Sequence, residues 1–386
     1  KWYESKEVTS VGEKNFQIWR HGDRTPAKTF KSDPYQEDAW PLGWGQLTPI
    51  GMEQMMELGD LLYKEYVVKN KFLNTSYKFN EMYVRTTDVN RTYISAYSNL
   101  IGMYYNRTQS IPNVNFPSNP RWPGLFVPFP VHATVDYAHD YVGNPRAYCP
   151  RREWLWSKTK ETPEFRKLEK ENDRFMKELT TVTGDNITLD RFWYLRDTLY
   201  IERLYNKTQR IIDETAYQRI DEIMDLLVDY GNGLDLTPVD NINFRVEVAK
   251  VRGGSILWAI IDNFDLKVLN RNFDTQLVLI NLFIVDFGRK LFCYEQANQD
   301  KPQCNWMKHL RYYAYSAHDT TLLALMSTLG VKHTLLQHGH PDYSACLSFE
   351  LWQTDNGPVL RQYAGGSGYQ YPLNPAIRIT YSTVKE

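Results

Sequence analysis

Short apolar runs alternate with longer helix-like segments in the first third of the chain. Residues 15–20 (NFQIWR) form a mostly apolar run that ends before a glycine, as a buried strand does. Residues 47–67 follow with apolar residues at helical spacing and Thr48 as the N-cap. A second strand and helix are expected over residues 81–87 and 88–105. This alternation favours an α/β fold with a mainly parallel central sheet flanked by helices.

The middle of the chain breaks this alternation. Residues 116–132 contain prolines throughout, which a central strand or helix does not tolerate. Residues 151–230 are highly charged and show repeated helical patterns. We therefore predict a smaller, mostly helical cap domain inserted into the α/β core. The predicted boundaries are 1–134 and 246–386 for the core and 135–245 for the cap.

The α/β character is expected to return in the last third. Residues 244–264 have a strand-like pattern, and residues 275–285 form another apolar run. Residues 312–317 (YYAYSA) alternate as a strand, and a helix is expected over residues 320–329. The longest apolar run, 277–285, is far shorter than the roughly 20 residues of a membrane helix. We expect no membrane span.

The charge balance excludes some classes of function. The 386 residues include 45 basic and 46 acidic side chains, which gives a formal net charge of −1. No basic patch or charged tail is visible, so we expect no nucleic-acid partner. The first residues lack the apolar stretch of a signal peptide, as is also true of a processed secreted chain.

Charged motifs directly follow three of the predicted strands. In parallel sheets the carboxyl ends of neighbouring strands meet at one edge, and helix N-termini there attract anions. We therefore expect these side chains to converge on one small anionic group. They are Arg20 at the end of the first strand with His21 and Arg24 after it, Arg85 at the end of the second, and His318 and Asp319 after the strand at 312–317.

The chemistry of this set fits a phosphate group. Arginine forks bind phosphate bidentately and keep their charge. Nearby cations lower the pKa of His21, so neutral imidazole can attack phosphorus even in acidic solution. Asp319 is the candidate proton donor to a departing alkoxide, and Gly22 would let the backbone approach the ligand. No metal or other cofactor is required, because the arginines supply the positive charge.

Each motif alone also has a purely structural explanation. The loop from Arg20 to Arg24 could be held by Arg–Asp ion pairs, and Arg85 could form a structural ion pair. His318 and Asp319 could be an ordinary helix start. The conjunction of three strand-end motifs suited to phosphate favours a single site.

The three motifs together resemble the signature blocks of the histidine acid phosphatases. The blocks are RHGDRTP (20–26), RTTDVNRT (85–92) and YSAHDTT (315–321), and the similarity extends over most of the chain. The resemblance implies an acid phosphatase that forms a phosphohistidine on His21, with Asp319 as the proton donor. It implies phosphate-binding roles for Arg20, Arg24, Arg85 and His318.

The residues between the blocks indicate the branch of the family and its partners. Asp23 before Thr25-Pro26 resembles the prostatic and lysosomal branch rather than the phytase-like members. Small phosphate monoesters are the expected substrates. Prostatic-type relatives dimerise through the Pro-rich stretch, where His132 matches the pattern and Phe126 replaces a tryptophan. A homodimer is therefore an open expectation.

Three other functions remain alternatives. A phosphomutase of the same superfamily would share the histidine and arginines but use a glutamate elsewhere as the acid. A phytase-like enzyme would need a wide basic cleft for inositol phosphates. A secreted binding or antigenic protein could retain the phosphatase fold and act through its surface.

The cysteines and glycosylation sequons favour a secreted or lysosomal (lumenal) protein with disulfides. Four cysteines allow three pairings, and four buried thiols are the alternative. The turn-like sequence between Cys293 and Cys304 favours that pair and leaves Cys149 with Cys346. Five asparagines lie in glycosylation sequons: Asn74, Asn90, Asn106, Asn186 and Asn206.

A histidine pair near the C-terminus could suggest a metal site. His338 and His340 alternate in a Gly- and Pro-containing loop. Such histidines are more often solvated than metal-bound, so we predict no metal site. One of them could still reach the rim of the phosphate site.

Overall fold

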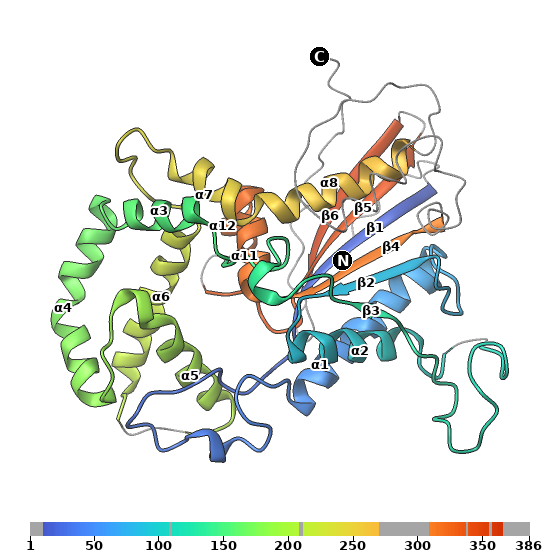
Figure 1. The fold of residues 1–386 in the computed structure, drawn as a ribbon, viewed down its shortest axis with the longest axis horizontal. Coiled ribbons are helices and arrows are strands. Elements are labelled where there is room, and N and C mark those ends of the chain that lie inside the picture. Colours follow the sequence, from blue (N-terminus) through green and yellow to red (C-terminus); the bar gives the residue numbers. More distant parts are fainter. Residues whose placement is uncertain are drawn as a thin grey trace.

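A six-stranded sheet forms the centre of the molecule (Figure 1). The computed structural model describes residues 11–107, 110–207, 211–269, 309–336, 339–354 and 357–365. The strand order is β3-β2-β4-β1-β5-β6. The strands are β1 (Val11–Arg20), β2 (Met82–Thr86), β3 (Val131–His132), β4 (Tyr312–Ala317), β5 (Cys346–Thr354) and β6 (Gly357–Gly365).

Four neighbouring strands run parallel, and the last two extend the sheet as an antiparallel pair. β1 and β2 both pair in parallel with β4, and β3 pairs in parallel with β2. β5 is antiparallel to β1, and β6 is antiparallel to β5. Arg20 lies opposite Ala317 and Thr86 opposite Ser316, so β1, β2 and β4 end at one edge. The predicted α/β class with a mainly parallel sheet is confirmed.

Helices cover both faces of this sheet (Figure 1). Alternate residues of β1 point to opposite faces, so Phe16 and Ile18 pack into one hydrophobic cluster and Trp19 into another. The Trp19 face is covered by α1 (Pro49–Tyr63) and α2 (Asn90–Tyr104), whose buried residues join its cluster. The Phe16 face is covered by α8 (Gly254–Leu269) and α11 (Asp319–Thr328).

The charged middle segment folds into four helices that lie to one side of the sheet (Figure 1). Pro163 opens the longest of them after the N-cap Thr162, and Gly184 ends it in the left-handed conformation at φ +70°. Apolar residues of three of these helices join the same cluster as Phe16. The division into a core and a cap at 134/135 and 245/246 stays a prediction. The helices are α3 (Pro150–Thr159), α4 (Pro163–Thr183), α5 (Phe192–Leu204) and α6 (Glu214–Gly231).

The strand-like expectation for residues 244–264 is wrong, because this segment is helical. It contains α7 (Phe244–Arg252) and the start of α8. Asn243 caps α7 by accepting a hydrogen bond from the backbone N–H of Val246, and Phe244 and Val248 are buried one helical turn apart. The predicted apolar run at 275–285 lies outside the described residues.

Shorter elements are α12 (Lys332–Leu335), a π-helical continuation of α1 at Lys64–Lys69, and 3₁₀ turns at Glu37–Ala39, Tyr137–His139 and Leu189–Arg191.

The predicted disulfide between Cys149 and Cys346 is wrong. Both thiols are free in the structure. Cys346 is buried at the start of β5 and its thiol donates to Oε1 of Gln17 at 2.9 Å, while Cys149 is the partly exposed N-cap residue of α3. Cys293 and Cys304 lie outside the described residues, so their pairing stays a prediction.

In the part of the chain that is described, no helix is long and apolar enough to span a bilayer.

Candidate active site

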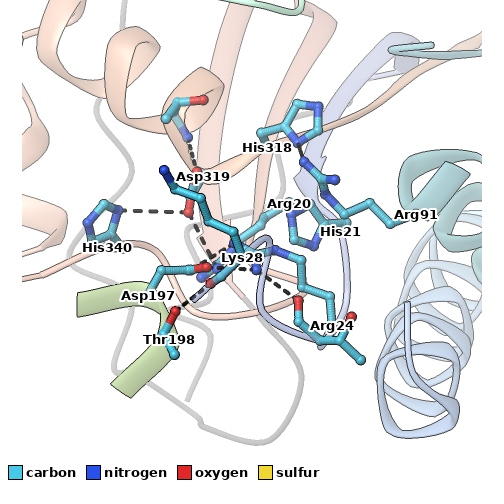
Figure 2. Close-up of polar contacts among 12 residues, drawn as sticks. Arg20, His21, Arg24, Lys28, Arg91, Asp197, Thr198, His318, Asp319 and His340 are labelled. Atoms are coloured by element: carbon cyan, nitrogen blue, oxygen red, sulfur yellow. Dashed lines mark hydrogen bonds and ion pairs between the residues drawn. The ribbon is translucent and has the colours of Figure 1, made fainter. Parts of the chain in front are cut away.

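The end of β1 and the end of β4 bring two histidines together. The parallel pairing of these strands continues past Arg20, where the backbone N–H of His21 donates to the carbonyl of Ala317 at 3.0 Å. The ring centroids of His21 and His318 are 5.5 Å apart. Figure 2 shows Arg20, Arg24 and Arg91 around them. The predicted convergence of the first and third motifs is therefore present in the structure.

The imidazole of His21 is oriented by its own loop. Its side chain is buried, and Nδ1 lies 2.8 Å from the carbonyl oxygen of Gly22. A carbonyl can only accept, so Nδ1 carries the proton and Nε2 keeps a free lone pair. Burial lowers the pKa of His21 well below its ordinary value, and the charges of Arg91, Arg20 and Arg24 lower it further. The predicted lowering is confirmed, with burial as the larger cause.

Three arginines around His21 keep a donor without a protein partner. The Nε atoms of Arg20, Arg24 and Arg91 are buried and make no hydrogen bond within the described part of the chain. Buried donors of this kind are unfavourable unless a ligand satisfies them. Positive charge and open hydrogen-bond donors at one point fit a phosphoryl group.

The remaining donors of these arginines are held by the protein. Arg20 donates through Nη1 to the carbonyl of Pro341, and its guanidinium carbon lies 4.1 Å above the ring of Tyr343. Arg24 uses both Nη atoms on the carboxylate of Asp197 in α5, at 3.0 and 2.8 Å. Nη1 also donates to the carbonyl of Thr25 at 3.0 Å, so the end fork is occupied and, among the described residues, Nε alone lacks a partner. Asp197 raises the pKa of Arg24 against the opposing effect of burial.

Arg85 is paired with a carboxylate in the structure, and its predicted contact with a phosphate stays a prediction. Its Nη2 lies 3.0 Å from Oδ1 of Asp140, both side chains are buried, and its guanidinium stacks 4.8 Å from the ring of Tyr315. Its charge is therefore already balanced by a carboxylate. Arg91, six residues further along the same sequence block, lies beside the histidines instead.

Arg91 was missed by the sequence analysis, although a physical signal existed. It lies in the first turn of α2, and side chains there tilt back towards the helix N-terminus and hence towards the strand ends. Its Nη2 donates to Nδ1 of His318 at 3.3 Å. Burial lowers the pKa of Arg91 to about 10, and the like charge of Arg24 adds to this effect. The position of Arg91 in the first turn of the helix that follows the second strand could have identified it from the sequence.

His318 is held at both ring nitrogens. It is the N-cap residue of α11, and Nε2 lies 2.9 Å from the hydroxyl of Thr87. Arginine can only donate, so Nδ1 accepts from Arg91 and Nε2–H donates to Thr87. Burial and then Arg91 lower the pKa of His318 well below its ordinary value. Contact between His318 and a phosphate stays a prediction, because it requires exchanging one of these partners.

Asp319 begins α11 and faces the arginines. Its Oδ1 accepts from the backbone N–H of Thr320 at 2.6 Å, and Oδ2 lies 3.4 Å from Nη2 of Arg20. Burial would raise the pKa of Asp319, but the charges of Arg20, His340, His21 and Arg24 outweigh it and hold the pKa well below 3.8. Its position opposite His21 across the arginines suits a proton donor, once a bound anion offsets those charges.

Gly22 has a packing role, and its expected approach to a ligand stays a prediction. A Cβ atom there would lie 2.2 Å from the carbonyl oxygen of Gly51 in α1. The loop after β1 therefore touches the backbone of α1 directly. Next to it, the carboxylate of Asp23 accepts from Thr48, the N-cap of α1, at 2.6 Å and from the hydroxyl of Tyr205. This loop is fixed on both sides.

One group of possible metal ligands occurs among the described residues, away from this cluster. The ligand atoms of Asp229, Asp235 and His333 lie within 4.8 Å of one another. The ammonium group of Lys332 lies 2.6 Å from Oδ1 of Asp229. A cation already neutralises this carboxylate, so the group is not assigned to a metal.

Comparisons with known proteins show what the chain is similar to. Residues 16–365 match the model of the histidine phosphatase superfamily (branch 2). Lysosomal acid phosphatase of Rattus norvegicus is 33% identical over 88% of this chain and 67% of its own length. Prostatic acid phosphatase of the same species is 32% identical over 90% of this chain and 76% of its own length. The crystal structure of a phytase from Klebsiella sp ASR1 shares the fold, with a TM-score of 0.56 and 15% identity over 93% of this chain and 83% of that one.

Proposed function

This chain belongs to the histidine phosphatase superfamily (branch 2), and we propose that His21 is the nucleophile of its acid phosphatase reaction on phosphate monoesters. The observation that carries the assignment is the free Nε2 of His21, surrounded by three arginines with unpartnered Nε donors. No other described histidine combines these features.

The first step transfers the phosphoryl group to His21. Nε2 attacks phosphorus while the Nε atoms of Arg20, Arg24 and Arg91 bind its oxygens and stabilise the charge of the transition state. The bond to the leaving oxygen breaks, and Asp319 gives that oxygen a proton. In the second step water attacks the phosphohistidine, gives a proton to Asp319, and releases phosphate. Arg91 is added to the predicted phosphate-binding residues, and the role of Arg85 stays a prediction.

The charges of the site fit an enzyme that works in acid. His21 must be neutral to attack, and its lowered pKa keeps it neutral below pH 6.5. Asp319 must be protonated to act as an acid, and the charge of a bound phosphoryl group raises its pKa by offsetting the arginines. Rates should therefore fall towards alkaline pH.

The first test is turnover of p-nitrophenyl phosphate from about pH 3 to pH 9 with and without a chelator. We expect an acidic optimum that the chelator leaves unchanged. His21→Ala should lower kcat by about 10⁴-fold or more, since removing a nucleophile has effects of that size. The control is His139→Ala, because His139 is exposed and lies outside the cluster. Full activity in His21→Ala would exclude His21 as the nucleophile.

The phosphoenzyme and the substrate class need separate measurements. Alkaline quenching after mixing with labelled substrate should trap label on the unchanged protein and none on His21→Ala. Transfer of that label to a sugar phosphate rather than to water would favour the mutase alternative. Turnover of inositol hexakisphosphate as fast as that of small esters would favour the phytase-like alternative. An inactive, stably folded chain would favour the binding-protein alternative.

We also propose that the protein is lysosomal or secreted. All five sequon asparagines are exposed, and two of the relatives named above are a lysosomal and a prostatic acid phosphatase. The test is a mass shift on enzymatic deglycosylation of the protein from its native source.

A homodimer stays a proposal, supported by the position of His132 on the edge strand β3. Sedimentation of the purified protein tests it.

A further inference from the structure

A histidine outside the signature motifs lies against the proton donor. Nδ1 of His340 is 3.8 Å from Oδ2 of Asp319, and Figure 2 shows the imidazole facing that carboxylate. His340 comes from the loop before β5, and its side chain is 14% exposed. The sequence analysis predicted no metal site at this histidine and left open that it reaches the rim of the phosphate site.

The ring nitrogen that faces Asp319 has no hydrogen-bond partner among the described residues. Nδ1 of His340 is buried, and 3.8 Å is slightly too long for a hydrogen bond. A movement of less than 1 Å by either side chain would close that contact. Buried polar atoms are normally satisfied, so an open one aimed at a catalytic carboxylate indicates an interaction that forms during the reaction.

The loop that carries His340 is tied to the rest of the site. The carbonyl of Pro341 accepts from Arg20, and the ring of Tyr343 lies under the same guanidinium. His340 thus lies beside Asp319, while Pro341 and Tyr343 of the same loop both contact Arg20. The position of His340 is therefore fixed by residues of the active site itself.

We propose that His340 is a positioning and proton-relay residue that holds the proton for Asp319 from one turnover to the next. This inference rests on the proposed function, because it requires Asp319 to be the donor. The same site could work without His340, but Asp319 alone would then have to keep its proton against two neighbouring arginines.

The proton balance of the relay closes in each turnover. Before the reaction Nδ1 of His340 holds the proton and Asp319 is ionised. When the bond between phosphorus and the leaving oxygen breaks, its electron pair stays on that oxygen, and the proton of Nδ1 passes through Asp319 to that oxygen, which leaves Asp319 ionised and His340 neutral. In the second step water bonds to phosphorus, the N–P electron pair returns to Nε2 of His21, and the water proton passes through Asp319 to His340. Both groups end in their starting states.

The charges that face His340 set when it can hold this proton. Asp319 lies on α11, Arg20 on β1, Arg196 on α5 and Arg146 in the loop before α3. Burial and the three arginines lower the pKa of His340 to about 4, and Asp319 opposes them. Two further carboxylates belong to its surroundings: Asp225 of α6 contacts Gly339, and Asp342 follows two residues later in the loop.

A bound phosphoryl dianion changes this balance in favour of the relay. It places negative charge on Arg20 and Arg24, and the pKa of both Asp319 and His340 rises when that positive charge is offset. The imidazole then holds a proton at a pH where the carboxylate alone would have lost it. The relay therefore extends the alkaline side of the activity profile.

The experiment compares pH profiles of kcat for the unchanged enzyme and for His340→Gln. Glutamine can still donate a hydrogen bond to Asp319 but cannot carry a proton. With an alkyl phosphate, whose leaving oxygen needs a proton, we expect the alkaline limb to move down by about one pH unit, a tenfold slower rate beyond it. With p-nitrophenyl phosphate, whose leaving group needs little protonation, the shift should be much smaller.

Two further measurements make the result decisive. His333→Gln removes a histidine that also lies against an aspartate, Asp235 at 3.3 Å, but away from the site, so its profile should not move. His340→Ala should lose the same alkaline activity and regain it with added imidazole. If His340→Gln folds stably and keeps the alkaline limb for alkyl esters, the relay is wrong. If imidazole does not rescue His340→Ala, the effect is structural and the relay is again wrong.

The failure of this inference is distinguishable from failure of the proposed function. If His21 forms the phosphoenzyme in the unchanged protein, the proposed function holds whatever the His340 variants do. If no phosphoenzyme forms, the function assigned to His21 fails first, and the relay fails with it.

Discussion

The strand-end side of the active site and the α5 side hold their charged residues by different means. On the strand-end side, His21, Arg91 and Asp319 each come from a junction between a strand and the next helix. On the other side, α5 contributes Asp197, which lies 173 residues from its partner Arg24. The first side places groups that we propose to bind the phosphate, and the second holds one of those groups, Arg24, in position. Changes to the two sides should therefore affect different kinetic quantities.

The largest effect is expected from Arg91→Ala on the strand-end side. Loss of one donor to the transition state lowers kcat/KM by about 10²–10³-fold. Arg91 adds a like charge beside Arg24, so its removal should leave the free energy of unfolding unchanged or increase it. Steady-state kinetics and thermal unfolding of the same preparation measure both. Nearly full activity would show that Arg91 does not bind the phosphate.

Arg85→Ala should produce the opposite pattern. It leaves the buried carboxylate of Asp140 without its partner at 3.0 Å, and breaking such a pair costs about 3–5 kcal/mol of stability. The fraction that stays folded should keep much of its kcat. Denaturant unfolding together with kinetics tests this. A stable but inactive Arg85→Ala would return Arg85 to the phosphate site.

A smaller effect is expected from Asp197→Asn on the α5 side. The amide keeps the shape of the carboxylate but loses its charge-assisted bonds to Arg24. Such bonds are worth about 1.5–3 kcal/mol, so we expect KM to rise about tenfold with little change in kcat. Initial rates over a wide range of substrate concentration would show the split. A fall in kcat with constant KM would mean that Asp197 acts in the chemical step.

The smallest effect is a shift of the acid limb of kcat/KM in Arg91→Gln. Burial is the first cause of the lowered pKa of His21 and Arg91 only the second, so removing the charge restores part of the shift. We expect the acid limb, where His21 gains a proton, to move to higher pH by about half a unit, roughly a threefold change in rate. The pH profile of kcat/KM measures it. A move to lower pH would contradict the assignment of that limb to His21.

Local sequence signals predicted the strand-end side well. Thr48 was expected to cap α1, and it accepts from the backbone N–H of Gly51 at 3.1 Å. The carboxyl ends of β1 and β4 were expected to share an edge, which their parallel register confirms. These features depend on a few consecutive residues, so propensity and capping rules are enough to find them.

The parts that the sequence analysis missed depend on contacts between distant segments. The choice between Arg85 and Arg91 depends on Asp140, whose approach to β2 no local pattern encodes. The pair of Arg24 and Asp197 depends on how α5 packs beside the loop after β1. Residues 244–264 contain apolar residues at both strand and helix spacing, so the pattern alone does not distinguish the two. In the structure they form helices that pack against α11.

The unpartnered donors of Arg20, Arg24 and Arg91 have a consequence for the enzyme after its reaction. Inorganic phosphate carries the same oxygens as the substrate, so it should bind these donors, compete with substrate and inhibit the enzyme. A ligand that binds only the folded chain also stabilises it, by about 2.7 kcal/mol at a hundred times its Kd. In surroundings rich in free phosphate the protein should therefore turn over more slowly and resist unfolding longer.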